Sequence, residues 1–227
     1  PQDTRKNTFI SDVDGSAQYY GVRPAQSRKQ TPNLVLTLHG ASVEGMGQAE
    51  AYGNHVDINW IAATNRRPYG FDWEDWGRKD AMEVLADASA RFPMDPAKVH
   101  LAGHSMGGQI SLTLALTAPE RVSALILSAP AGIERFSPGG GAWMKSYWTE
   151  TRALEAREEE VRLNFTQLVF NRVDEHVEAL LEERVRMQKT PEFAATSVAV
   201  SRCIAGMIDY PVFSRLDEIK APTLLIY

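Results

Sequence analysis

A serine flanked by glycines is the strongest chemical signal in the sequence. The pentapeptide GHSMG at 103–107 matches the pattern G-x-S-x-G. It follows an apolar, strand-like run at 98–103 and precedes a small-residue helical pattern at 106–117. In this context a tight strand-to-helix turn holds the serine in a strained conformation and projects its Oγ from the sheet. Side chains in place of the two glycines would collide with the neighbouring strand and helix. The pattern predicts a nucleophile at Ser105.

Two backbone N–H groups are candidates for binding the oxyanion that forms when a serine attacks a carbonyl carbon. The amide of Met106 lies at the expected helix N-terminus, where the dipole and a free N–H favour negative charge. The run LTLHGA at 36–41 ends a buried strand in His-Gly, and the amide of Ala41 is the second candidate. His39 is by itself expected to fill the core.

Alternating strand and helix patterns surround these residues. A helix is expected from about Arg78, with apolar residues at i, i+3, i+4 and i+7 and with Pro93 stopping it, and another helix is expected at 106–117. Strands separated by helical crossovers predict an α/β fold, a mostly parallel sheet with helices on both faces. The strands are expected at 18–22, 33–39, 58–64, 98–103, 122–129 and 222–227.

The pattern changes after Gly132. A turn-rich segment, SPGGG at 137–141, leads into a stretch without strand patterns that extends to Tyr210. We expect a helical cap at 133–210, inserted into a core formed by 1–132 and 211–227. The charged run at 157–160 is expected to be a solvated helix face.

Composition excludes several classes of protein. The 227 residues carry 24 Lys plus Arg against 29 Asp plus Glu, a net charge of −5, which is unlike a nucleic-acid binder and disfavours anionic membranes. No apolar run is long enough to span a bilayer. Cys203 is the single cysteine. His100 and His104 lie on a strand and turn, so they form no metal-binding face, and we expect no metal. The sequence leaves the compartment and the oligomeric state open.

On these motifs the chain resembles the α/β-hydrolase fold. The stretches LTLHGAS, FDWEDWGRKD and MDPAKVHLAGHSMGG resemble serine esterases and peptidases related to prolyl oligopeptidase and polyester depolymerases. The second half, which resumes with IKAPTLLI at 219–226, resembles the helical caps of esterases and carbon–carbon-bond hydrolases. The two halves indicate different branches of the family. The resemblance therefore implies one fold but leaves several substrate classes open.

The resemblance also implies a triad in the order nucleophile, acid, histidine. In the family the acid usually follows the strand that resembles 222–227 and the histidine comes one strand later, whereas this sequence ends at Tyr227. We expect a C-terminal piece of about 40 to 70 residues to carry both, and this chain alone to be impaired. Glu134 is an alternative acid, and His176 is expected on a cap surface.

The main functional prediction is a serine hydrolase that cleaves small-molecule carboxylic esters through an acyl-enzyme at Ser105. No cofactor is expected, because the reacting groups all belong to the protein. Trp73, Trp76 and His104 are candidates for the substrate pocket, and plain packing is an equal alternative for the tryptophans. A peptidase, a carbon–carbon-bond hydrolase and a non-catalytic binding protein that kept the pocket remain as alternatives.

Overall fold

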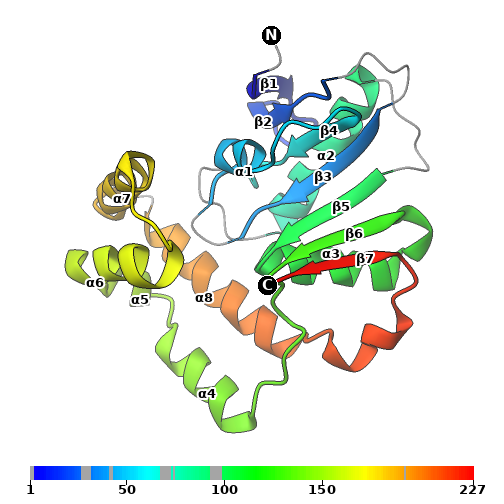
Figure 1. Cartoon of the computed structure of the whole chain (residues 1–227). Helices are drawn as coiled ribbons and strands as arrows, with labels where there is room; N and C mark the ends of the chain where they lie inside the picture. The colour runs from blue at the N-terminus through cyan, green and yellow to red at the C-terminus, as the bar shows by residue number, and fades with distance from the viewer. Residues whose placement is uncertain are drawn as a thin grey trace. The chain divides into compact units, whose positions relative to one another are not determined.

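The computed structural model describes residues 3–26, 32–40, 43–66, 73, 75–92, 99–191 and 193–227. It divides into two compact units (Figure 1). The core unit comprises Pro1–Arg135 and Met207–Tyr227, and the helical unit comprises Phe136–Gly206. From the sequence we had expected the inserted segment to be residues 133–210. No helix within the described ranges is long and apolar enough to cross a membrane.

A seven-stranded sheet forms the centre of the core unit, in the order β1-β2-β4-β3-β5-β6-β7. β1 pairs antiparallel with β2 and β2 antiparallel with β4, and all the remaining pairs are parallel. This confirms the predicted mostly parallel sheet. The strands are β1 (Arg5–Ile10), β2 (Ala17–Arg23), β3 (Asn33–Leu38), β4 (Ile58–Ala62), β5 (Val99–His104), β6 (Ala124–Ser128) and β7 (Thr223–Ile226).

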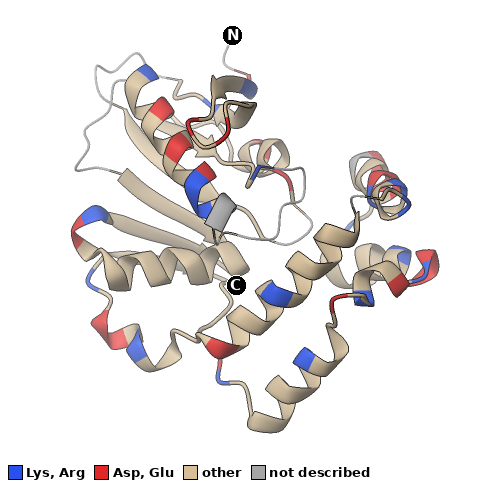
Figure 2. Cartoon of the chain, turned by 180° about the vertical axis from the view of Figure 1, so that it is seen from behind, with Lys and Arg blue, Asp and Glu red and all other residues tan. Residues whose placement is uncertain are grey.

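Helices cover both faces of the sheet. Gly21 of β2 faces α1 (Gly45–Ala51), where an added Cβ would lie 3.1 Å from the Ala49 Cβ. The preceding residue, Tyr20, donates a hydrogen bond of 2.7 Å to Asp87 of α2 (Asp75–Arg91). Successive strand residues point to opposite faces, so α1 and α2 lie on opposite sides. Figures 1 and 2 show α2 on the same side as α3 (Met106–Thr117).

Two elements were not expected from the sequence. β1 exposes most of its residues and buries mainly Phe9, so its hydrophobic alternation is weak. α1 begins with glycines, which are poor helix formers. The Glu44 side chain compensates by accepting a hydrogen bond from the Gly47 amide at 2.6 Å, which caps the helix.

The helical unit has its own small core. Val161, Phe165, Leu181 and Val185 pack together. On its surface Arg162 contacts both Glu158 and Glu182 at 2.8 Å, and Figure 2 shows charges of both signs mixed on these helices. Its elements are α4 (Pro138–Tyr147), α5 (Arg152–Glu155), α6 (Glu158–Leu163), the π-helical η3 (Asn164–Val169), α7 (Glu175–Gln188) and most of α8 (Phe193–Asp209). Short 3-10 turns, η2 (Pro119–Arg121) and η4 (Phe213–Glu218), belong to the core unit.

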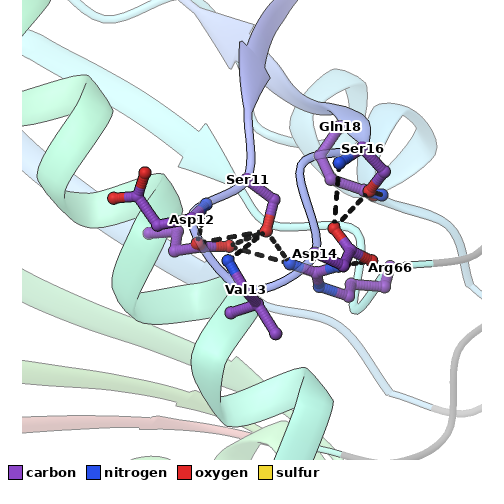
Figure 3. A network of polar contacts seen from close by, with 8 residues as sticks. Ser11, Asp12, Val13, Asp14, Ser16, Gln18 and Arg66 are labelled. Carbon is purple, nitrogen blue, oxygen red and sulfur yellow. Dashed lines mark hydrogen bonds and ion pairs between the residues drawn. The ribbon is translucent and has the colours of Figure 1, made fainter.

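A polar network holds the β1–β2 turn against α2 and the segment after β4 (Figure 3). Arg66 contacts Asp14 at 2.8 Å and Glu83 at 2.9 Å, and it also donates to the Ser11 hydroxyl. Hydrogen bonds from the Ser16 hydroxyl and amide, with help from Arg66, lower the pKa of Asp14 to about 2. The backbone of Arg66 is left-handed, with φ of 61°.

A buried carboxyl group lies beside this network. Asp80 of α2 has no exposed surface, and neither of its oxygens has a hydrogen-bond partner of good geometry within the described residues. Burial raises the pKa of Asp80 to about 6, although the nearby amides of Asn65 and Arg66 oppose the shift. Between about pH 4 and 6 the folded protein therefore retains a proton that the unfolded chain releases.

We expect the free energy of unfolding to fall as the pH rises through this interval. The full shift corresponds to roughly 3 kcal/mol, and Asp80→Asn, which cannot ionise, should be more stable than wild type by about this amount at pH 7.5. Urea titrations at pH 4 and 7.5 measure the difference, with Asp12→Asn at an exposed position as control. Equal pH dependence in Asp80→Asn and wild type would contradict the prediction.

Candidate active site

The chain turns sharply at Ser105, between β5 and α3. This residue has φ of 52° and ψ of −119°, a region that costs a non-glycine residue about 1–3 kcal/mol. Its neighbours hold it there through the backbone: its amide donates to the Ser128 carbonyl at 3.0 Å, and its carbonyl accepts from Gly108 and Ala131, both at 2.9 Å. The strained turn expected from G-x-S-x-G is confirmed.

The Ser105 hydroxyl is not used to cap the helix that follows. Serine at an N-cap normally has β-region dihedrals and accepts a hydrogen bond from the first turn. Ser105 is the N-cap residue of α3, but with its positive φ it makes no side-chain capping bond. The residue is half-buried, and its Oγ is not engaged in capping α3.

Glycines allow the close packing around this turn. A Cβ at Gly103 would lie 2.6 Å from the Gly108 Cα. A Cβ at Gly107 would lie 2.9 Å from the carbonyl carbon of Leu38, at the end of β3. Both neighbours are backbone atoms, which cannot move aside cheaply. The predicted reason for glycine at 103 and 107 is therefore confirmed.

The end of β3 lies against the serine turn. A Cβ at Gly40 would lie 3.0 Å from the Ser105 Cβ and 2.7 Å from the His104 Nδ1. Ala41, the predicted second oxyanion donor, lies outside the described residues, one position beyond this contact. Met106, the predicted first donor, is the first residue of α3, and amides of the first helical turn have no intrahelical acceptor.

His39 and Trp73 pack together in the core. Their rings are 5.1 Å apart, and the Trp73 indole donates to the His39 carbonyl at 3.0 Å. The His39 ring nitrogens face the carbonyls of Gly40 and Thr64, at 2.9 and 3.5 Å. Burial lowers the pKa of His39, which makes it a neutral core residue as expected. Trp73 is 4% exposed, so its contacts are those of a packing residue.

The other candidates are less constrained. His104 is half-buried, and burial lowers its pKa. Glu134, the alternative acid, is exposed. The side chains of Trp76 and His176 lie outside the described part of the chain. Within that part, no group of three or more His, Cys, Asp or Glu residues could hold a metal ion.

A cation in the helical unit was not expected from the sequence. Burial lowers the pKa of Arg184 in α7, and its guanidinium lies 4.4 Å from the centre of the Phe193 ring. Its buried Nη1 has no hydrogen-bond partner within the described residues, and neither has the Ser197 hydroxyl, one turn after Phe193 on α8. The sequence did contain a signal for the burial of Arg184: the residue continues the apolar stripe of α7 that passes through Leu181.

The comparisons with known proteins bear on the fold that carries this turn. A family model described as the alpha/beta hydrolase fold matches residues 34–227. The chain belongs to this family. The α/β-hydrolase fold predicted from the sequence is thereby confirmed.

Several proteins to which this chain is similar are enzymes. A 2-hydroxy-6-oxononadienedioate/2-hydroxy-6-oxononatrienedioate hydrolase from Escherichia coli is 29% identical over 210 residues, which are 87% of this chain and 70% of that enzyme. The solved structure of the 2-hydroxy-6-oxo-6-phenylhexa-2,4-dienoate hydrolase of a Rhodococcus strain matches with a TM-score of 0.61 at 18% identity. The match covers 98% of this chain and 80% of that hydrolase. The structure of a thermophilic esterase matches with a TM-score of 0.57 at 18% identity. The match covers 98% of this chain and 77% of the esterase chain.

Proposed function

We propose that the protein is a serine hydrolase in which Ser105 attacks the ketone or ester carbonyl carbon of a small-molecule substrate. The observation that carries the proposal is the strained Ser105 turn, whose Oγ does not cap α3. A strained residue persists only where its surroundings enforce it, and such residues cluster at active sites. The family supports hydrolysis as the reaction class.

The reaction would proceed through an acyl-enzyme. A general base takes the Oγ proton as Ser105 adds to the carbonyl carbon, and the amides of Met106 and Ala41 hold the oxyanion. The oxyanion then collapses, the bond to the leaving group breaks, and the leaving group takes a proton. Water attacks the acyl-enzyme, which releases a carboxylic acid and restores the Ser105 hydroxyl. The net change is the addition of one water across the broken bond.

A carbon–carbon bond is the first candidate for the bond that breaks. A departing carbon must hold an electron pair, and in the keto tautomer of a 2-hydroxy-dienone that pair is delocalised through the remaining double bond into the second carbonyl, so that the leaving group departs as a dienolate. The curated relative from Escherichia coli acts on conjugated oxo-dienedioates, and it matches most of this chain. We therefore propose a vinylogous diketone with a carboxylate as the substrate class.

Ester hydrolysis is the second candidate. Attack by Ser105 on an ester requires the same oxyanion donors and no conjugated leaving group, so the turn favours neither bond by itself. Comparing kcat/KM for a 2-hydroxy-6-oxo-dienoate acid with that for p-nitrophenyl acetate decides between them. A higher kcat/KM for the ester would overturn the carbon–carbon assignment. If Ser105→Ala still catalysed both reactions, the serine mechanism would be overturned.

A further inference from the structure

The chain passes between the core unit and the helical unit twice, and the two passages touch each other within the core unit. We call residues 129–135 the outgoing crossing and residues 207–212 the returning crossing. The amide of Val212 on the returning crossing donates to the carbonyl of Gly132 on the outgoing one, at 3.0 Å. The two crossings are therefore hydrogen-bonded to each other as well as to the rest of the core.

One buried side chain contacts both crossings. Gln109 lies on α3, one turn after Ser105, and is 6% exposed. Its Nε2 donates to the carbonyls of Tyr210 at 2.9 Å and Met207 at 3.2 Å. Both neighbours are acceptors, so only the amide nitrogen can face them. These carbonyls lie at the C-terminal end of α8, where backbone carbonyls have no N–H donor within the helix.

The outgoing crossing is held on the same helix. Gly132 has φ of 81°, and a Cβ there would lie 2.7 Å from the Gln109 Cγ, so the backbone of Gly132 packs directly on the Gln109 side chain. The amide of Ala131 donates to the Ser105 carbonyl at 2.9 Å. Contacts thus run without a break from the serine turn through both crossings.

We propose that Gln109 is a positioning residue that fastens both crossings to the helix carrying the serine turn, so that release of the crossings displaces the backbone of Ser105. The side chain acts through its donors. Its Oε1 is buried without a hydrogen-bond partner within the described residues, and a buried unpaired acceptor costs stability. Removing the whole amide group should therefore release the crossings with little effect on global stability.

The test is amide hydrogen exchange of Val212 and Ala131 in wild type, Gln109→Met and Gln109→Glu. Methionine fills similar space without donors, and we expect it to speed exchange at both amides about tenfold. Glutamate turns acceptors toward the two carbonyls and should speed exchange further. Gln188→Met is the matched control, since Gln188 donates to the carbonyls of Ala153, Leu154 and Ala156 inside the helical unit alone.

Unchanged exchange in Gln109→Met, or the same acceleration in Gln188→Met, would overturn the proposal. Urea unfolding of each variant separates local release from global destabilisation: parallel changes in unfolding and in exchange would also overturn it. The coupling to Ser105 rests on the proposed function, and its readout is kcat, which should fall in Gln109→Met and stay constant in Gln188→Met. Accelerated exchange with unchanged kcat would refute the coupling, whereas inactivity of the wild-type protein purified from its source would refute the proposed function alone.

Discussion

Ser105→Ala, made in the protein as its source produces it, is expected to reduce turnover by roughly 10⁴–10⁶-fold while the fold stays intact. The substitution removes the only atom that can form the acyl-enzyme, and hydrolases that lose their nucleophile keep only the contribution of the oxyanion donors and of binding. The hydroxyl makes no capping bond to α3, so its loss costs the helix nothing. Steady-state turnover and urea unfolding of the same preparation measure the two halves of the prediction.

Ser105→Gly is a second variant that separates chemistry from conformation. Glycine adopts a positive φ readily, so it should relieve the strain at 52° and raise the free energy of unfolding by about 1 kcal/mol. Activity should be lost as fully as in Ser105→Ala. Near-wild-type turnover in either variant would rule out Ser105 as the nucleophile, and a less stable glycine variant would contradict the account of strain.

Gly107→Val is expected to destabilise the core unit by about 3 kcal/mol or more and to reduce activity at least 100-fold. A Cβ at this position meets the backbone of Leu38 and the His39 carbonyl, at 2.9 and 3.0 Å. Relieving that contact requires α3 to move away from β3, and the serine turn moves with it. Thermal unfolding and kinetics on the natural substrate class provide the measurement.

Gly139→Ala is the matched control for a glycine replaced within a helix. It lies in α4, and an added Cβ there meets nothing within 4 Å. Alanine has the higher helix propensity, so this variant should be slightly more stable than wild type, by up to about 1 kcal/mol. If Gly107→Val were tolerated as well as Gly139→Ala, the close approach of α3 to β3 would not be needed.

The parts of the fold that the sequence predicted are those with strong local signals. The run NLVLTL is apolar at nearly every position, which is typical of a central parallel strand, and it forms β3, buried along its length. The helix expected from Arg78 is α2, which begins slightly earlier, at Asp75. The serine turn was predictable because its glycines and its strand-to-helix context occur together in the sequence.

The elements and residues that were missed depend on tertiary contacts. β1 owes its conformation to pairing with β2 rather than to its own alternation. Gln109 lies four residues after Ser105, but its partners at Met207 and Tyr210 are distant in sequence. Arg184 follows a charged pair, Glu182 and Glu183, which favours a solvated position when read locally. Its place beside the apolar stripe through Leu181 was a weaker signal, and the packing of α7 and Phe193 shows that it is desolvated.

The most direct test of the serine mechanism is the intact mass of the protein, purified from its source, before and after reaction with a fluorophosphonate. Such reagents phosphonylate a serine only where its Oγ is activated and oxyanion donors are in place. The account predicts one adduct, located on the peptide that contains Ser105 and absent from Ser105→Ala. An unmodified mass in an enzyme that still turns over its substrate, or an adduct at another residue, would contradict it.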